Sequence, residues 1–569
     1  MERYEYDVVV IGAGGAGLRA AIEASGAGAR TALICKSLLG KAHTVMAEGG
    51  VAAAFGNVEP EDSWETHFQD TLFGGKYLNN WRMAELHAQE APARVEELEH
   101  WGAVFDRTPD KLMNQRAFGG HTYRRLVHIG DRTGLELIRT LQDKAIHTGV
   151  DVFMECTVSR LLKDGNRVSG TYGYRRGNGE PQLFRAGAVV LATGGAGKCW
   201  RVTSNSAECT GDGYALAFDA GAELVDMEFV QFHPTGMVWP PAVKGLLVTE
   251  AVRGEGGILR NSKGERFMER YDPKRMELST RDVVARAIYT EVREGRGSPR
   301  GGVFLDVSHL PAATVKKKLP SMYDQFHELA GVDITAEPME VGPTCHYFMG
   351  GISVEADTGQ TTVPGLFAAG ECSGGMNGAN RLGGNSLSDL LVFGKRTGEH
   401  AARAAAASSI DDEQVRDAAA ELDGYLEGTG DDPYALHAEL QTTLQDGVGI
   451  YRDHVGLQTA AHKLDQLERR GARVKAPVGG RAYNPGWHLC REVRNMLEVA
   501  QAVTRSALLR EESRGAHSRL DHPGFDDFWG ANNVVARKTE SGVDVQPRPV
   551  RTAPALAELV SQRQAAEAK

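Results

Sequence analysis

The chain has 569 residues, of which 64 are Lys or Arg and 75 are Asp or Glu, and its formal net charge is −11. A net acidic chain does not attract phosphate backbones, so its charge argues against nucleic acids as partners. At roughly 150 residues per domain, the length predicts three to four domains whose cores need neither a disulfide nor a structural metal.

The cysteines and the apolar runs narrow the class of protein further. Seven cysteines lie far apart and none forms a Cys-x-x-Cys pair, which fits reduced thiols and excludes the usual spacing of zinc and iron–sulfur ligands. The sequence contains no run of about 18 apolar residues, so no membrane-spanning helix is predicted. The N-terminal residues MERYEY lack the apolar core of a signal peptide. We therefore expect a soluble protein that faces the cytoplasm.

A βαβ unit is predicted at the N-terminus. Residues 7–11 form an apolar run typical of a strand buried on both faces, 14–27 form a helix of small residues, and 31–35 form a second strand. Further elements are expected as helices at 80–101 and 131–147 and as strands around 151–160, 165–174 and 182–193.

The remaining chain divides by composition. Short, charged, mixed elements from about 230 to 345 indicate an inserted domain, and a buried strand returns at 365–370. Residues 400–510 have helical spacing without a strand signal, and a polar tail ends in a loose helix over 552–569. The predicted α/β architecture is a Rossmann-like domain at 1–230 and 345–400, an inserted α+β domain at 231–344, a helical domain at 401–515 and a C-terminal domain at 516–569.

A glycine-rich turn directly after the first strand predicts a dinucleotide site. It consists of Gly12, Ala13, Gly14, Gly15, Ala16 and Gly17. This G-x-G-x-x-G spacing lets the backbone approach a pyrophosphate at a helix N-terminus. The acidic ribose partner of a plain NAD site is replaced by Cys35, Lys36 and Ser37. The ATGG turn at 192–195 and GLFAAGE at 365–371 recur in two-domain flavoproteins, so FAD is the expected cofactor.

Several ordered motifs resemble one family. Residues 42–50, AHTVMAEGG, resemble the segment that binds flavin covalently through histidine in succinate dehydrogenases and fumarate reductases, although the family usually has Ser at the position of Ala42. Six further segments resemble motifs of the same family. They are DMEFVQFHPTG at 226–236, LVTEAVRGEGG at 247–257, TRDVVAR at 280–286, PTCHY at 343–347, GANRLGGNS at 378–386 and SRGAH at 513–517. The sequence is identified as a member of this flavoprotein-subunit family.

The resemblance implies how FAD is held. It implies a covalent bond to His43, which would raise the flavin potential and suit oxidation of a saturated dicarboxylate. Besides the glycine motif, the implied cofactor contacts are Lys36, Ser37, Ala42, Thr44, Gly49, Gly50, Asp212, Glu371, Asn385, Ser386 and Leu387. A structural Na⁺ or K⁺ is implied near Tyr347, Met349, Gly350 and Glu371.

The resemblance also implies the substrate site. Arg381 with His346 would bind one carboxylate of a four-carbon dicarboxylate, and His233 with Thr249 would bind the other. Arg281 would be the proton shuttle, with Glu250 and Arg253 as its relay to solvent. Because a free arginine is a poor base, the proton must pass in concert along these groups. The inserted domain at 231–344 would be a capping domain that closes over the flavin.

The expected function is therefore oxidation of succinate to fumarate, with hydride transfer to FAD and electron transfer to an iron–sulfur subunit. The same residues would serve fumarate reduction by microscopic reversibility. L-aspartate oxidase is a more distant alternative: it lacks the flavin-linking histidine, has a Glu for the substrate amine where this chain has apolar Phe118, and usually has Ala-Ser at the position of Gly383 and Gly384. A non-catalytic flavin carrier is disfavoured because Arg281, Arg381, His233 and His346 are all present.

The expected partners are an iron–sulfur subunit together with one or more membrane-anchor subunits of a quinone oxidoreductase. We therefore expect the chain to lie at the cytoplasmic face of the membrane, peripheral through those subunits.

Overall fold

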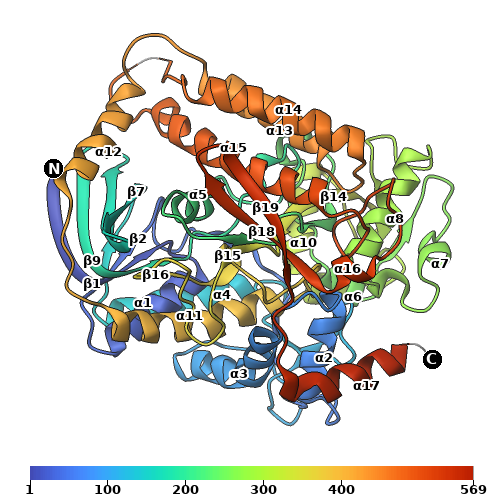
Figure 1. Cartoon of the computed structure of the whole chain (residues 1–569). Helices are drawn as coiled ribbons and strands as arrows, with labels where there is room; N and C mark the ends of the chain where they lie inside the picture. The colour runs from blue at the N-terminus through green and yellow to red at the C-terminus, as the bar shows by residue number, and fades with distance from the viewer. Residues whose placement is uncertain (478, 568–569) are drawn as a thin grey trace.

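A seven-stranded sheet places the glycine motif. In the computed structural model, which describes residues 1–477 and 479–567, five strands of this sheet run parallel. They are β6 (Asp151–Phe153), β2 (Thr31–Ile34), β1 (Glu2–Ile11), β9 (Pro181–Leu191) and β16 (Leu366–Ala368). β8 (Arg167–Arg175) and β7 (Cys156–Asp164) extend it antiparallel. Figure 1 shows α1 (Gly15–Gly26), α4 (Thr133–His147) and α11 (Asn385–Ala404) together beneath the sheet.

The turn between β1 and α1 depends on glycine. Residues 8–11 at the end of β1 are fully or almost fully buried, as their apolar run predicts. Gly12 then takes φ +109°, which favours glycine, and a Cβ at Gly17 would lie 1.7 Å from the carbonyl oxygen of Gly12. Only glycine at position 17 allows this close approach, so α1 begins directly at the carboxyl end of β1.

The inserted region has its own sheet and core. Its antiparallel strands are β11 (Val230–Met237), β14 (Met339–Phe348), β13 (Val303–Asp306) and β12 (Ile258–Arg260), in that order. The helices of this region are α6 (Ala251–Gly254), α7 (Met268–Tyr271), α8 (Arg281–Arg293), α9 (Ala312–Lys318) and α10 (Pro320–Ala330). Val284 and Ile288 of α8 pack with Leu305 and Met339 of the sheet in a cluster separate from the main core.

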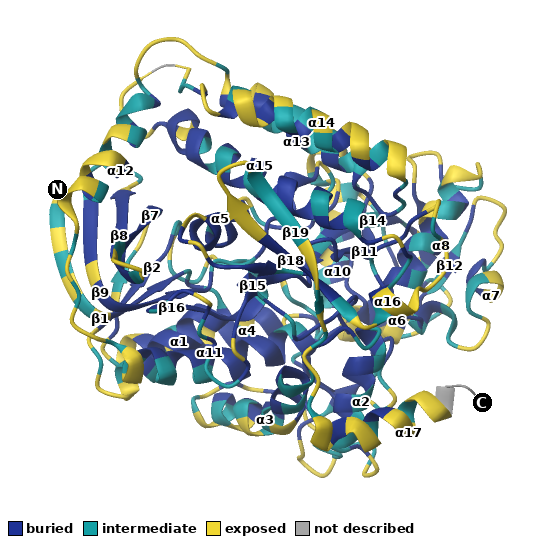
Figure 2. Cartoon of the chain, viewed as in Figure 1, coloured by how far each residue is buried: buried dark blue, intermediate teal, exposed yellow. Residues whose placement is uncertain are grey.

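Smaller sheets and helices complete the chain. A three-stranded sheet joins β3 (Val51–Ala52), β5 (Leu126–Val127) and β4 (Gln115–Arg116), and another joins β17 (Ser373–Gly374), β15 (Gly351–Ser353), β10 (Leu224–Val225), β18 (Asn532–Thr539) and β19 (Gly542–Pro549). The other helices are α2 (Trp64–Gly74), α3 (Trp81–His100), α5 (Asp212–Asp219), α12 (Asp412–Gly424), α13 (Pro433–Gly447), α14 (His454–Gly471), α15 (Pro485–Leu509), α16 (Asp527–Gly530) and α17 (Ala557–Glu567). Figure 2 shows exposed residues on the outer faces of α12, α14 and α17 and buried residues in the central sheet.

The mixed α/β architecture predicted from the sequence is confirmed, with two local differences. The strand expected at 151–160 is two strands, because Glu155 takes φ +50° and interrupts the extended chain. The C-terminal helix predicted to be loose is packed over its described residues, Ala557–Glu567, because Val560 is 4% exposed and packs against α2 and α3 together with Leu556 just before the helix; residues 568–569 lie outside the described chain. Among the helices of residues 1–477 and 479–567, none has the length and apolarity needed to cross a membrane.

Candidate active site

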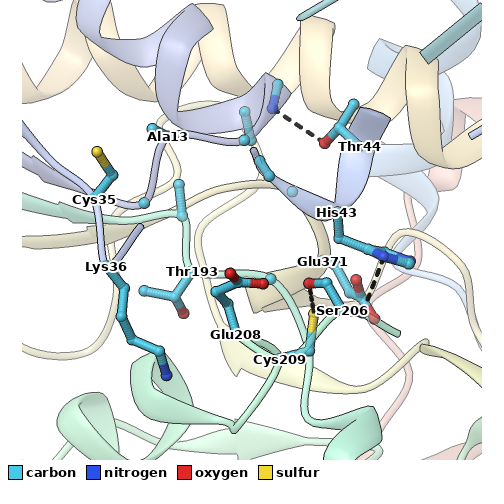
Figure 3. Close-up of a pocket in the computed structure, with 18 of the residues that line it drawn as sticks. Ala13, Cys35, Lys36, His43, Thr44, Thr193, Ser206, Glu208, Cys209 and Glu371 are labelled. Atoms are coloured by element: carbon cyan, nitrogen blue, oxygen red, sulfur yellow. Dashed lines mark hydrogen bonds between the residues drawn. The ribbon is translucent and has the colours of Figure 1, made fainter. Parts of the chain in front are cut away.

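A large pocket opens at the carboxyl ends of β1 and β2. It contains about 1370 Å³ of space outside the protein atoms, part of it open to solvent. The predicted cofactor residues that line it are Gly12, Ala13, Gly14, Gly15, Ala16, Lys36, Ser37, Ala42, His43, Thr44, Asp212, Glu371, Ser386 and Leu387. Figure 3 shows Lys36 and His43 on opposite sides of this space, with Ala13 and Thr44 along one wall.

The glycine motif fits a dinucleotide phosphate. Gly14 and Gly15 lie in the pocket wall at the start of α1, where the helix dipole favours an anion. The Gly15 amide donates to Thr44 Oγ1 at 3.2 Å, which joins the helix to the segment that carries His43. Because Gly14 has no side chain, a phosphate can approach the backbone at this position.

A buried ion pair occupies one end of the pocket. Lys36 Nζ lies 2.9 Å from Asp212 Oδ2 and 3.1 Å from Glu492, while Asn495 donates to Asp212 Oδ1 at 2.9 Å. Burial alone would raise the pKa of Asp212, but the charge of Lys36 and the hydrogen bonds from Lys36, Asn495 and Thr210 together hold that pKa below its ordinary value. Asp212 is therefore an ionised acceptor, suited to the hydroxyl groups of a ribose.

His43 lies on a 3₁₀ turn, His43–Met46, at the other end. The Ser206 amide donates to its Nδ1 at 3.4 Å, and Asn205 Nδ2 lies 3.4 Å from its Nε2. Burial lowers the pKa of His43 to about 4, so the imidazole is neutral near pH 7. A neutral ring retains the lone pair that a covalent bond to a flavin would require.

Four predicted cofactor residues lie behind the pocket wall. Gly17 packs on Gly12, and a Cβ at Gly49 would meet the Phe118 ring at 2.5 Å. Gly50 has φ +135° and lies against Val127. Asn385 is fully buried with its side chain bonded to His67 and Thr71 at 3.0 Å each. These residues support the lining segments.

The predicted proton relay is assembled from three segments. Arg281, the first residue of α8, donates from Nε to Glu250 Oε2 at 2.8 Å, and Arg253 Nη2 lies 3.6 Å from the same oxygen. The Gly119 amide donates to Glu250 Oε1 at 2.8 Å. Burial would raise the pKa of Glu250, but Arg281, Arg253 and the Gly119 amide together lower it by more than burial raises it. The carboxylate is therefore ionised.

The guanidinium group of Arg253 does not reach the solvent. It is 2% exposed, and its Nη1 donates to the carbonyl oxygen of Glu277 at 2.6 Å. The predicted passage of a proton to solvent must therefore continue beyond Arg253.

Gln231 of β11 joins two arginines that lie far apart in sequence. Its Oε1 accepts from Arg281 Nη1 at 3.3 Å and from Arg381 Nη2 at 3.1 Å. Its Nε2 donates to Asn380 Oδ1 at 3.0 Å and to the carbonyl oxygen of Arg381 at 2.8 Å. Every polar atom of this amide is thus used to hold the arginines in register.

Arg381 lies between the pocket and this relay. It lines the pocket, donates to Ser386 Oγ at 2.6 Å, and stacks with its Cζ 4.2 Å from the centre of the Tyr347 ring. Burial, followed by the charge of Arg281, lowers the pKa of Arg381 to about 9, which still leaves it cationic at pH 7.

Two predicted substrate histidines meet beside Arg381. The rings of His233 and His346 are 5.1 Å apart, centre to centre, and Ser204 Oγ lies 2.8 Å from His346 Nδ1. Burial lowers the pKa of both histidines well below the ordinary value, so both are neutral. They can orient a carboxylate by hydrogen bonds, while the attraction for its charge must come from the arginines.

The other predicted substrate residues are also buried. Thr249 is 2% exposed, and its Oγ1 accepts from the Ala251 amide at 3.3 Å, at the start of α6. Phe118 is 4% exposed and packs between Gly49 and Gly383 without lining the pocket. It forms an apolar wall on the side of the relay.

Around the predicted cation position, the Glu371 carboxyl lies next to the chain before Met349. Its Oε1 accepts from the Phe348 amide at 3.0 Å, and burial raises its pKa to about 7. Tyr347 lines the pocket, whereas Met349 and Gly350 lie behind it. In the part of the chain that the structure describes, no group of three or more His, Cys, Asp or Glu side chains could hold a metal ion.

Several residues that shape the site could not be identified from the sequence. The role of Gln231, which lies inside the motif at 226–236, is one of these, because a shared acceptor depends on where Arg281 and Arg381 lie in space. Asn205, Ser206 and Glu208 belong to a polar segment between β9 and α5, and the structure brings this segment to His43 and the pocket.

Comparisons with known proteins agree with this geometry. The chain matches the family model "FAD binding domain" over residues 7–387 and "Fumarate reductase flavoprotein C-term" over residues 437–564. It is 48% identical to a subunit of the fumarate reductase (CoM/CoB) of Methanothermobacter marburgensis, over 95% of this chain and 98% of that protein.

Solved structures of known proteins are also similar to this chain over nearly its whole length. Mycobacterium smegmatis Sdh1 in complex with UQ1 is 55% identical with a TM-score of 0.87, covering 97% of this chain and 96% of that one. The FrdA chain of E. coli quinol fumarate reductase is 37% identical with a TM-score of 0.93, covering 97% and 98%.

The fold and the pocket define an FAD-binding oxidoreductase with an inserted domain beside the flavin site. More particularly, the chain belongs to the family of flavoprotein subunits of succinate dehydrogenases and fumarate reductases.

Gly383 tests the geometry of the relay. A Cβ there would lie 2.5 Å from the Phe118 ring and 3.1 Å from both Arg281 Nη2 and Glu250 Oε2. We expect Gly383→Ala to slow turnover of succinate or fumarate by about 100-fold, because a displacement near 1 Å has that effect on aligned groups. Bound flavin, measured by absorbance, should remain, because Gly383 does not line the pocket. Gly26→Ala, with no atom within 4 Å of its Cβ, is the matched control; a wild-type rate for Gly383→Ala would contradict the geometry.

Proposed function

We propose that the chain is the catalytic flavoprotein subunit of a succinate:quinone oxidoreductase, which oxidises succinate to fumarate and passes the electrons to an iron–sulfur subunit. The observation that carries this proposal is a buried excess of positive charge beside the pocket. Arg253, Arg281 and Arg381 are each at most 7% exposed. In the described ranges, the only carboxylate within 4 Å of these guanidinium groups is that of Glu250.

This charge excess favours a dianion. Three guanidinium groups and one carboxylate leave two positive charges uncompensated, which equals the charge of a four-carbon dicarboxylate. Burying charges without a partner is costly, so a site of this kind is stabilised when an anion of matching charge binds. Because His233 and His346 are neutral, they add hydrogen bonds without changing this balance.

The protein residues divide the work of binding. Arg381 and His346 would hold one carboxylate, and His233 and Thr249 would hold the other, which orients the carbon–hydrogen bonds between them. Phe118 would present an apolar face to the methylene carbons, where an ammonium group would have no partner. The capping region would exclude water from this space.

Proton transfer would occur on the protein side of the substrate. When bound, FAD supplies the acceptor for the hydride that leaves the other carbon. Arg281 would receive the proton from the substrate while Glu250 accepts from Arg281 Nε, so the guanidinium never has to exist as a free base. Arg253, whose Nη2 lies 3.6 Å from the same carboxylate oxygen, also stabilises the ionised form of Glu250.

Fumarate reduction is the second candidate, because the same residues serve the reverse reaction. The names of similar proteins include both activities: the M. marburgensis protein is named a fumarate reductase, and the flavoprotein subunit of Coxiella burnetii, 38% identical, is named a succinate dehydrogenase. The potential of the electron acceptor would decide the direction in the cell.

The same comparisons support a proposal about the partners. Similar proteins are named as flavoprotein subunits, and the Sdh1 structure contains UQ1. We propose that this chain assembles with an iron–sulfur subunit together with one or more membrane-anchor subunits, and so lies at the cytoplasmic face of the membrane.

Anaerobic bleaching of the visible flavin band tests the proposed substrate. We expect succinate to bleach the band and malonate to prevent it, because both dicarboxylates match the charge of the site. Glu250→Gln should lower the bleaching rate by about 100-fold or more, since a carboxamide cannot accept the proton. Bleaching by L-aspartate in place of succinate would contradict the proposal and favour the amino-acid oxidase.

The covalent bond to His43 is a separate proposal, supported by its neutral ring at the pocket wall. Denatured wild-type chain should remain fluorescent in a gel under ultraviolet light, whereas His43→Ser should release its flavin. Under native conditions the variant should retain FAD absorbance and oxidise succinate more slowly, because an unlinked flavin has a lower potential. Complete release of flavin from the denatured wild type would refute the bond.

We also propose that Na⁺ or K⁺ binds near Tyr347, Met349, Gly350 and Glu371, since the Glu371 carboxyl lies close to this chain segment. Replacing both ions with choline should lower the melting temperature of the holoprotein, because a ligand bound only to the folded state stabilises it. A melting temperature that is the same in all three salts would count against the site.

A further inference from the structure

Residues 118–125 connect the active site to a distant part of the chain. At one end, the Gly119 amide donates to Glu250 Oε1 at 2.8 Å. His121 Nε2 lies 2.8 Å from the carbonyl oxygen of Gly383, in the loop that carries Arg381. This segment therefore contacts both the carboxylate of the proton relay and the loop of the substrate arginine.

The tautomer of His121 follows from its contacts. Burial and the charge of Arg125 lower the pKa of His121 to about 4, so the ring is neutral. Because a carbonyl oxygen only accepts, Nε2 carries the proton, and Nδ1 faces Arg125 Nη1 at 3.5 Å. His121 thus acts as a fixed donor to Gly383.

The other end of the segment is held by Asp70 of α2. The Thr122 amide donates to Asp70 Oδ2 at 2.8 Å, and Thr122 Oγ1 donates to Oδ1 at 2.6 Å. Arg125 Nη2 lies 3.0 Å from Asp70 Oδ2 and 2.8 Å from Asp62. Neither carboxylate side chain is exposed, so these contacts are not weakened by water.

The C-terminal helix completes this arrangement. Arg563 Nη2 lies 3.1 Å from Asp70 Oδ1, its Nη1 donates to Thr122 Oγ1 at 3.3 Å, and its Cζ lies 5.0 Å from the centre of the Phe73 ring. Gln69 Nε2 also donates to the carbonyl oxygen of Leu559 at 2.9 Å. Figure 1 shows α17 alongside α2, and the two helices are in direct contact.

We propose that Arg563 is a positioning residue for the proton relay: through Asp70 and Thr122 it holds residues 118–125 so that the Gly119 amide stays on the Glu250 carboxylate. Arg563 donates to both partners at once, which couples the helix to the segment rather than to α2 alone. The C-terminal helix would thereby act on a carboxylate that it does not touch.

The expected effect on Glu250 has a definite sign. The groups that face Glu250 are Arg281 of α8, Arg253 of α6, Arg381 of the loop before α11 and, from residues 118–125, the Gly119 amide and His121. The amide bond lowers the pKa of Glu250, so losing it raises that pKa. Glu250 would then be protonated at a higher pH, and the acid limb of the rate profile would move upward in pH.

Hydrogen–deuterium exchange of the holoprotein tests the mechanical part. We expect Arg563→Ala to speed exchange several-fold in peptides that cover 117–125, and Arg563→Lys to restore protection in part, because lysine keeps the charge but not the second donor. Gln562→Ala, at an exposed position of the same helix, should leave these peptides unchanged. Unchanged exchange in Arg563→Ala would overturn the proposal.

The pH profile of flavin reduction by succinate tests the functional part, which rests on the proposed function. At the acid pH values where the rate of the wild type falls, we expect Arg563→Ala to be roughly 3–10-fold slower than the wild type. At higher pH, where Glu250 is ionised in both proteins, we expect little loss, and Arg563→Lys should give an intermediate profile. An equal loss at every pH would indicate only a structural role and would overturn the proposal. A wild-type flavin that succinate does not reduce would contradict the proposed function, while the exchange experiment would still decide whether Arg563 holds the segment.

Discussion

The site depends on holding like charges together in a buried space. Arg281 and Arg381 share the Gln231 oxygen, while Arg281 and Arg253 share Glu250. Each shared acceptor offsets part of the repulsion between neighbouring guanidinium groups, and the remainder favours an anionic substrate. The surrounding fold can be understood from this constraint, since these residues come from β11, α6, α8 and the loop before α11 and must be held against their mutual repulsion.

Close approach of backbones is the second requirement. A methyl group at Gly17 would overlap the carbonyl of Gly12, and one at Gly383 would overlap the Phe118 ring and crowd Arg281 and Glu250. These glycines allow α1 to pack on β1 and allow the arginine loop to pass beside Glu250. The glycine-rich composition of the chain thus serves contacts between segments as much as contacts with a cofactor.

Burial also divides the titratable groups into two kinds. His43, His233 and His346 are neutral because burial lowers the pKa of each ring, and at His43 the charge of Glu208 offsets this only in part. Glu250 and Asp212 remain ionised because cations contact them directly. The charge of the site is therefore carried by arginine, lysine and carboxylate groups, and the neutral histidines can contribute only hydrogen bonds.

The βαβ unit and the glycine turn could be predicted from the amino-acid order alone, because strand periodicity, helix starts and glycine spacing depend on neighbours in the chain. Most of the other residues that line the pocket were implied by the resemblance of the motifs to one family. The packing of distant segments was needed to learn that Gln231 bridges two arginines, that Asn385 turns away from the pocket, and that Arg563 reaches Thr122 across 441 positions. Such contacts depend on how separate elements pack against one another, and the spacing of residues within one segment does not show which distant segment it will contact.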